Sequence, residues 1–291
     1  MLATPNRWAV VVAWLISVSP AQAAELPAEF DWRANGGNYL PRVRDQGQCA
    51  SCWAHAALAV MESMLKITAK RPDWDPNLSE QQLVSCGPCG SCEDNCEDLS
   101  QVFEFILQQN GVATEADFPY VVSDKVPCES AALDWRERAF PLTSYARVPR
   151  DTPSLKQQLL SGPVIFKFTV YQDFFSHSSG VYRHQWGDAL GTHYGVLVGW
   201  SDRDKAWIVR NSWGSDFGDG GYFRLLYEDS NIQKDLGYAL QVDLPESFTP
   251  PQEPDPIPVG PGCGCASLAD PPGLLALWAL YLGALLLRRT Y

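Results

Sequence analysis

Two cysteines three positions apart, Cys49 and Cys52, limit what this chain can fold into more than any other feature of the sequence. They follow Gln46-Gly47-Gln48 and precede apolar residues at helical spacing, namely Trp53, Ala56, Ala57, Val60, Met61, Met64 and Leu65. This spacing predicts an amphipathic helix with one buried face. Cys52 then lies in the first turn, where unpaired N–H groups and the helix dipole lower the pKa of a thiol. We therefore expect Cys52 to be a nucleophile, the alternative being that both cysteines are structural.

A catalytic thiol needs a base, a group that orients the base, and donors for an oxyanion. The chain has four histidines. We expect His55 to be a packed residue of the Cys52 helix, and His177 and His184 to flank an exposed loop. His193 lies at the start of a predicted buried strand, where the alternative is a satisfied core histidine. Its distance from Cys52, about 140 residues, is typical of papain-type enzymes.

Further along, Asn211-Ser212-Trp213-Gly214 supplies the remaining partners of a thiol–imidazole pair. The side-chain carbonyl of Asn211 can fix an imidazole ring, and Trp213 can shield that hydrogen bond from water. The first half of the chain is mostly helical in pattern, and the second half carries short apolar runs separated by turn residues. A helical half and a β half predict two lobes with a cleft between them as the place for a site.

At these residues the chain resembles the papain-like cysteine peptidases over roughly residues 27–244. The motifs that carry the resemblance are Phe30-Asp31-Trp32-Arg33, residues 46–53, Leu78-Ser79-Glu80-Gln81-Gln82-Leu83-Val84-Ser85-Cys86, His193, Asn211-Ser212-Trp213-Gly214 and Gly220-Gly221-Tyr222-Phe223-Arg224. The resemblance implies a peptidase domain over 24–246 with an α+β fold. Its helical lobe would span about 40–135, and a β-barrel-like lobe about 136–246, with the active-site cleft between them.

The same resemblance implies the roles of individual residues. Cys52 would be the nucleophile, His193 the general base and acid, and Asn211 the residue that orients His193. The side-chain amide of Gln46 and the backbone N–H of Cys52 would hold the oxyanion. The expected substrate-binding residues are Ala50, Trp53, Thr192 and Trp213, the last lining the leaving-group side.

The implied activity is hydrolysis of proteins or peptides, as an endopeptidase, with no cofactor and no metal. A non-catalytic papain-fold module for binding or adhesion is the alternative, and the complete catalytic set argues against it. The chain departs from the family pattern at Ala50, where glycine is usual, and at His55, where an aromatic residue is usual. After Cys96 it has Glu97-Asp98-Leu99 in place of Asn-Gly-Gly. These departures leave the substrate specificity open.

The N-terminus predicts export. Arg7 precedes an apolar run over residues 8–18 and an A-x-A pattern at Ala21-Gln22-Ala23, so we expect a signal peptide over 1–23. The alternative is a transmembrane anchor, for which the run is short. Export implies a compartment in which disulfides persist. The net charge of −12 argues against nucleic acid as a partner.

Six cysteines besides Cys52 lie in the globular part, which allows 15 pairings. The resemblance implies the disulfides Cys49–Cys96 and Cys86–Cys128, and we expect Cys89 to pair with Cys92. Cys86, Cys89, Cys92 and Cys96 also have the C-x₂-C-x₂-C-x₃-C spacing of an iron–sulfur ligand run, and a zinc site is a related alternative. Glu97 in place of the usual proline, and export without a twin-arginine signal, count against a cluster.

Beyond residue 246 the composition changes. A Pro-rich linker spans 247–262 and ends at Gly262. The tail over 263–291 then begins with Cys263-Gly264-Cys265 and continues with an apolar run over 274–287 and Arg288-Arg289. The tail resembles myxobacterial-type C-terminal sorting signals. This resemblance implies attachment to the cell surface or outer membrane, or secretion after processing of the tail. The alternative is a plain C-terminal membrane anchor. We expect the protein to be a monomer.

Overall fold

The computed structural model describes residues 25–89, 92–93, 96–232, 237–245 and 248–249. The expected signal peptide, the tail over 263–291 and most of the linker lie outside these residues. Within the described ranges, no helix combines the length and the apolar character needed to cross a membrane.

Helix α1 (Cys52–Ala69) is the centre of the structure. It packs against helix α2 (Glu80–Cys86) on one side and against strands β5 (Ala189–Ser201) and β8 (Gly237–Val242) on the other. Fifteen of its 18 residues are buried, so the prediction of a single buried face is wrong. A helix covered on both sides has no polar face to keep in water, and the run of alanines in its first turns lets its neighbours approach closely.

The remaining helices are short. Ser79 caps α2 as the sequence predicted, because its hydroxyl accepts a hydrogen bond from the backbone N–H of Gln82 at 3.0 Å. Asp151 caps helix α4 in the same way through the N–H of Ser154. The other helical segments are α3 (Ser100–Gln108), α4 (Thr152–Leu159), and the 3₁₀ turns η1 (Cys128–Ser130), η2 (Trp135–Arg138) and η3 (Gln172–Ser176).

Eight strands form one sheet, in which the path β2-β8-β3-β5-β6-β7-β4 is extended by β1 on β5. The bounds not yet given are β1 (Glu29–Asp31), β2 (Leu142–Val148), β3 (Val164–Tyr171), β4 (Val181–Tyr182), β6 (Ala206–Arg210) and β7 (Tyr222–Leu226). Among the described residues β2 pairs with β8 and β4 with β7, so the ends of the path do not meet. The sheet is open, so the expectation of a barrel-like closure is wrong. Strand β4 has only two residues, and both of them pair with β7.

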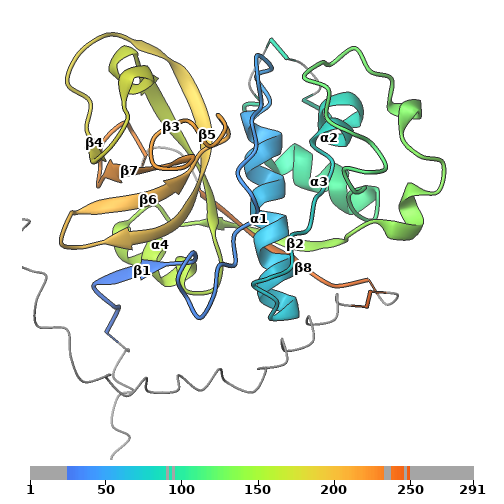
Figure 1. The fold of residues 1–291 in the computed structure, drawn as a ribbon, viewed down its shortest axis with the longest axis horizontal. Helices are drawn as coiled ribbons and strands as arrows, with labels where there is room; N and C mark the ends of the chain where they lie inside the picture. Colours follow the sequence, from blue (N-terminus) through green and yellow to red (C-terminus); the bar gives the residue numbers. More distant parts are fainter. Residues whose placement is uncertain (1–24, 90–91, 94–95, 233–236, 246–247, 250–291) are drawn as a thin grey trace, which may run out of the picture. The chain divides into compact units, whose positions relative to one another are not determined.

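Helices α1 to α3 lie on one side of the molecule and strands β3 to β7 on the other (Figure 1). Strand β5 joins the two sides, because its side chains alternate between faces. Val196 and Val198 belong to the core around α1, whereas Leu197 belongs to a second core formed by aromatic residues of the sheet. That second core includes Phe166, Phe168, Phe174, Trp200 and Trp207.

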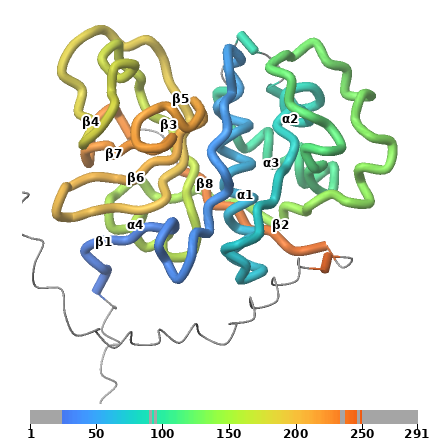
Figure 2. The backbone as a smooth tube through the Cα atoms, in the orientation of Figure 1, coloured from blue at the N-terminus to red at the C-terminus, as the bar shows by residue number. Residues whose placement is uncertain are grey.

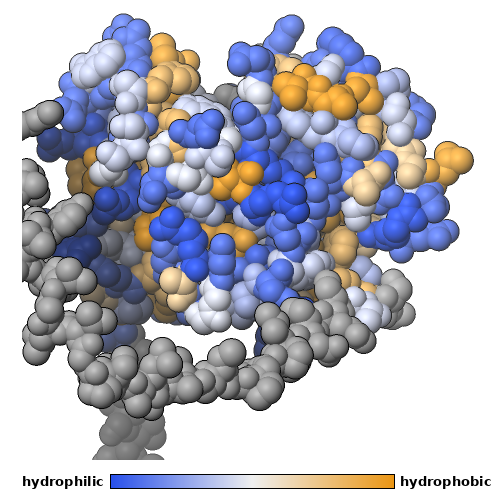
Figure 3. All heavy atoms as spheres, in the orientation of Figure 1, coloured by the Kyte–Doolittle hydropathy of each residue, from blue (hydrophilic) through white to orange (hydrophobic). Residues whose placement is uncertain are grey.

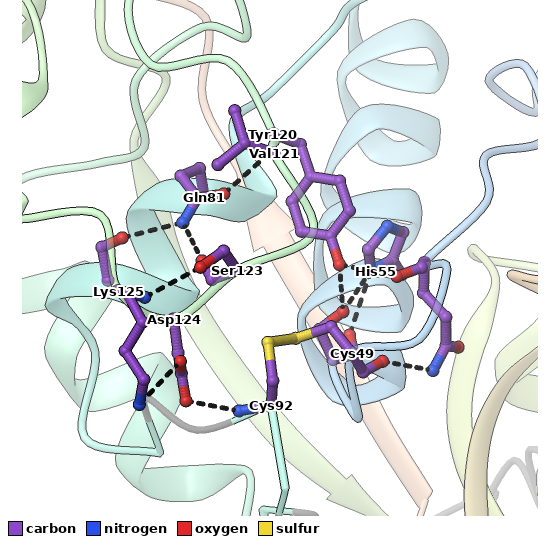
Figure 4. The surroundings of a disulfide bond; sticks show 12 residues. Cys49, His55, Gln81, Cys92, Tyr120, Val121, Ser123, Asp124 and Lys125 are labelled. Atoms are coloured by element: carbon purple, nitrogen blue, oxygen red, sulfur yellow. Dashed lines mark hydrogen bonds and ion pairs between the residues drawn. A yellow bond between two sulfur atoms is a disulfide. The ribbon is translucent and has the colours of Figure 1, made fainter.

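The disulfides differ from the expected set. Cys86 is bonded to Cys128, but Cys49 is bonded to Cys92 and Cys89 to Cys96, so the expected pairs Cys49–Cys96 and Cys89–Cys92 are wrong. Two hydrogen bonds explain the difference. The N–H of Ala50 donates to the carbonyl of Cys92 at 3.0 Å, and the N–H of Cys92 donates to the Asp124 carboxylate at 2.9 Å (Figure 4). These bonds hold Cys92, rather than Cys96, beside Cys49.

The same disulfides use all four cysteines of the C-x₂-C-x₂-C-x₃-C run, so none of them is a thiolate that could ligate iron or zinc in this structure.

Candidate active site

Three segments meet at the start of α1. The segment over residues 40–51 runs alongside α1, between the helices and the sheet (Figure 2). Its backbone is paired with the segment that follows β6, because Gln46 N–H donates to Ser212 O at 2.8 Å and Gly214 N–H donates to Arg44 O at 3.1 Å. The third segment is β5, which pairs antiparallel with β6. The residues expected in catalysis are thereby brought together from distant parts of the sequence.

His193 and Asn211 form a buried hydrogen-bonded pair. The Asn211 side chain is 1% exposed, and its Oδ1 lies 2.8 Å from His193 Nε2. Because Oδ1 can only accept, Nε2 carries the proton and the lone pair of the neutral ring is on Nδ1. The ring of Trp213 lies 4.8 Å from the His193 ring, and the ring of Phe168 meets it edge-on at 5.5 Å. Burial lowers the pKa of His193 to about 4, although the Asn211 bond acts in the opposite direction.

Cys52 is the first residue of α1 and is the one described cysteine outside the three disulfides. Burial raises its pKa to about 11, although backbone hydrogen bonds from Tyr194, Trp53 and Cys52 itself act to lower it. Desolvation thus shifts the pKa of this thiol in the direction opposite to the lowering expected from the helix N-terminus. The contact with the Tyr194 backbone places the sulfur beside the residue that follows His193.

Gln46 is held by hydrogen bonds on every side. Its Nε2 donates to Cys49 O at 2.8 Å, and its Oε1 accepts a bond from Ser212 Oγ at 2.7 Å. Its backbone carbonyl accepts a bond from the Tyr120 hydroxyl at 2.8 Å. The Nε2 group has two hydrogens, and the bond to Cys49 uses one of them. The second hydrogen can be donated to a ligand while the amide stays in a fixed position.

Ser212 and Tyr120 were not assigned roles from the sequence, although both support Gln46. Ser212 stands inside the Asn211 motif, which is a signal that could have identified it. Tyr120 had no such signal, because only the tertiary structure brings it to Gln46 and to Ser51, whose Oγ lies 2.8 Å from its hydroxyl.

Buried ion pairs also hold the segment over residues 40–51 in place. Arg44 lies 2.8 Å from Glu62 of α1 and 3.2 Å from Glu80 of α2, and both carboxylates are buried. Burial and the neighbouring Glu62 raise the pKa of Glu80 to about 8, and Arg44 opposes this shift. Since Arg44 O accepts the bond from Gly214, this cluster ties the site to both α1 and α2.

The expected substrate-binding residues have different surroundings. Trp53 is 0% exposed in the core around α1, and its contact with a substrate stays a prediction. Its position follows from the burial of α1 on both sides. Ala50, Thr192 and Trp213 are each partly exposed around Cys52 and His193.

Of the other histidines, His55 lies next to this arrangement without belonging to the catalytic pair, and His177 and His184 lie near η3. His55 is buried on α1 as predicted, and its Nδ1 donates to Ser51 O at 3.0 Å (Figure 4). Burial lowers the pKa of His55 to about 3. His184 Nδ1 lies 3.3 Å from an Asp173 carboxylate oxygen, and His177 packs against Tyr182.

Comparisons with known proteins agree on one family. The family model described as papain family cysteine protease matches residues 26–240. Probable cysteine protease RD21C of Arabidopsis thaliana is 35% identical over 243 residues, which cover 80% of this chain and 52% of the relative. Fruit bromelain of Ananas comosus is 30% identical over 230 residues, covering 78% of this chain and 62% of that protein. The chain thus spans between half and two-thirds of the length of these curated relatives.

Two solved structures have the same fold. The bromelain protease from Ananas comosus in complex with the E64 inhibitor superposes with a TM-score of 0.63 at 29% identity, covering 75% of this chain and 100% of that one. Procathepsin B S9 from Trypanosoma congolense gives a TM-score of 0.67 at 26% identity, covering 76% and 80%.

Proposed function

Because this chain belongs to the papain family of cysteine proteases, we propose that it hydrolyses peptide bonds through an acyl-enzyme on Cys52. The observation that carries this proposal is the buried 2.8 Å bond from His193 Nε2 to Asn211 Oδ1, next to the start of α1. It fixes the imidazole with its basic Nδ1 left to exchange a proton with the thiol. His193 acts as general base and then as general acid.

Burial raises the pKa of Cys52 and lowers that of His193, and attraction between a thiolate and an imidazolium at this site acts against both shifts. His193 Nδ1 takes the thiol proton as the sulfur attacks the substrate carbonyl. The tetrahedral intermediate collapses when the C–N bond breaks and His193 gives the proton to the departing amine. Water then attacks the thioester with His193 again as base, and the thiol is restored.

The negative charge on the carbonyl oxygen is held by Gln46 and by the start of α1. The Gln46 amide is already fixed by Cys49 and Ser212, so it donates without a cost for reorganisation. The backbone N–H of Cys52 is the second donor, at the positive end of the α1 dipole. The substrate would lie between a helical lobe and a β lobe, with Ala50, Thr192 and Trp213 along its path.

We also propose that the protein is an exported monomeric endopeptidase of proteins or peptides. Three disulfides among the described residues fit an oxidising compartment. Residues 1–23 would be removed on export, and the tail over 263–291 would attach the protein to the cell surface or be processed. Mass spectrometry of the mature termini tests both points, and a mature chain that keeps Met1 or Tyr291 would contradict the corresponding step.

Kinetics of single variants test the catalytic proposal. Cys52→Ala should abolish cleavage of a peptide substrate, and His193→Ala should nearly abolish it, while both keep the wild-type thermal transition within a few degrees. Arg136→Ala is the control, since Arg136 of η2 contacts Trp135 and Gln109, which have no part in the proposed site, and should leave turnover unchanged. Cleavage by folded Cys52→Ala protein would refute the assignment. A folded wild-type protein that binds peptides without cleaving them would favour a binding module instead.

A further inference from the structure

Phe175 is a large aromatic side chain left exposed next to the proposed active site. It lies near the end of η3 and is 61% exposed, whereas most other phenylalanines on the sheet side of the molecule are buried. Its ring stacks on that of Trp213 at a centroid distance of 5.3 Å and an interplanar angle of 5°. Trp213 in turn lies 4.8 Å from the His193 ring. Phe175 and Trp213 thus form a contiguous apolar surface beside a functional group, and surfaces of this kind mark binding sites.

The position of Phe175 is fixed by the residues before it. Phe174 is fully buried and packs against Trp213 at 5.4 Å, Phe217 at 5.3 Å and Phe223 at 4.9 Å. Because successive residues of this tight turn point in different directions, burial of Phe174 directs Phe175 outward along the face of Trp213.

A buried carboxylate holds the turn itself. Asp173 accepts hydrogen bonds from the Tyr182 hydroxyl at 2.6 Å and from the backbone N–H of Gln185 at 2.7 Å. It also accepts one from the N–H of Trp186 at 3.3 Å, and its own carbonyl accepts a bond from Ser176 Oγ at 2.8 Å. The aromatic surface is therefore rigid before a substrate arrives, which lowers the entropic cost of binding to it.

We infer that Phe175 and Trp213 together form an aromatic surface that selects substrates with an aromatic or large aliphatic residue directly after the scissile bond. This inference rests on the proposed function. The amine that leaves takes its proton from His193, so the side chain on that amine lies beside Trp213 and its extension, Phe175. A flat apolar side chain there covers both rings, whereas glycine covers neither.

Partitioning of the acyl-enzyme measures this surface directly. With one ester substrate, the acyl group on Cys52 is the same in every assay, and added amines compete with water for it. The amine forms the new C–N bond as the C–S bond breaks, the sulfur leaves as thiolate, and His193 takes the amine proton. The ratio of transfer to phenylalaninamide over transfer to glycinamide then reports binding on the leaving-group side alone.

Wild-type protein should prefer phenylalaninamide, and Phe175→Ala should reduce that preference about two- to tenfold, the range for loss of an aromatic pair. Phe175→Leu should restore part of it. Trp186→Ala is the matched control, because Trp186 is also an exposed aromatic residue, lies between β4 and β5, and should leave the ratio unchanged.

An equal preference in wild type and Phe175→Ala would overturn the inference, and so would an equal loss in Trp186→Ala. Ester hydrolysis in the absence of amines separates the two proposals. Normal hydrolysis with no selectivity among amines would contradict the aromatic surface alone. Absence of hydrolysis by folded wild-type protein would contradict the proposed function, and with it this inference.

Discussion

Replacing Asn211 by alanine removes the acceptor that fixes His193. Asn211 Oδ1 accepts two bonds, from His193 Nε2 and from the backbone N–H of Ser212, each at 2.8 Å. In Asn211→Ala the buried Nε2–H has no acceptor. The imidazole avoids this unsatisfied donor by carrying its proton on Nδ1, so most of the population has Nδ1 protonated and cannot take the Cys52 proton.

The size of the effect follows from burial. Leaving the buried Nε2–H unsatisfied costs about 1–3 kcal/mol, and in the variant the productive tautomer carries this cost whereas the tautomer protonated on Nδ1 avoids it. At 1.36 kcal/mol per tenfold, kcat/KM should fall about 5- to 150-fold. The loss stays below that of His193→Ala, because Trp213 and Phe168 still hold the ring from two sides. The same unsatisfied group should lower Tm by a few degrees.

The assay compares kcat/KM of wild type and Asn211→Ala on one peptide substrate, with Tm measured for both. Asn38→Ala is the matched control, since Asn38 Oδ1 also accepts a backbone N–H, that of Leu40 at 3.0 Å, at the opposite end of α1. It should leave kcat/KM unchanged. If folded Asn211→Ala protein retained kcat/KM within twofold of wild type, the orienting role of Asn211 would be wrong.

Three other predictions concern the surroundings of the nucleophile. Gln46→Ala should lower kcat about 10²- to 10³-fold with little change in KM, as loss of an oxyanion donor does, and steady-state kinetics check this. His55→Phe should make the protein less sensitive to acid. The pKa of His55 is about 3 in the folded protein and 6.5 in the unfolded chain, so the unfolded chain binds the proton at a higher pH. The free energy of unfolding of the wild type therefore falls as the pH drops from 6.5 toward 3. This term is about 2–3 kcal/mol at pH 4.5, so the Tm difference between pH 7 and pH 4.5 should be smaller in the variant. Peptide mapping without reduction should recover Cys49 joined to Cys92, and a Cys49–Cys96 peptide would contradict the structure.

The residues proposed for catalysis could be singled out in the sequence because their chemistry depends on residue type and local motif. Cys52 at a helix start can be recognised from a few neighbouring letters, and so can Asn211 before Ser212 and Trp213. The structure places His193 and Asn211 within hydrogen-bonding distance because β5 and β6 are antiparallel neighbours. The cap of α2 at Ser79 is local in the same sense.

Features that depend on tertiary contacts could not be read from the sequence. The choice of Cys92 as partner of Cys49 depends on Asp124, far along the chain. The burial of Trp53 and the raised pKa of Cys52 both arise because α1 is covered by helices and by the sheet.

The role of exposed residues also could not be predicted from the sequence, because it depends on their neighbours in the fold. The face of the molecule in Figure 3 is mostly hydrophilic with scattered apolar side chains. The sequence gives no means of telling which exposed apolar residue adjoins the site, and only the stacking on Trp213 distinguishes Phe175.

The central claim is that Cys52 is the nucleophile, and covalent labelling tests it most directly. Wild-type protein treated with a thiol-directed epoxide inhibitor should gain the mass of one inhibitor, and peptide mapping should place the adduct on Cys52. Cys52→Ala should gain none, and Asn211→Ala should be labelled more slowly than wild type. An adduct on another residue, or an equal adduct on Cys52→Ala, would contradict the account.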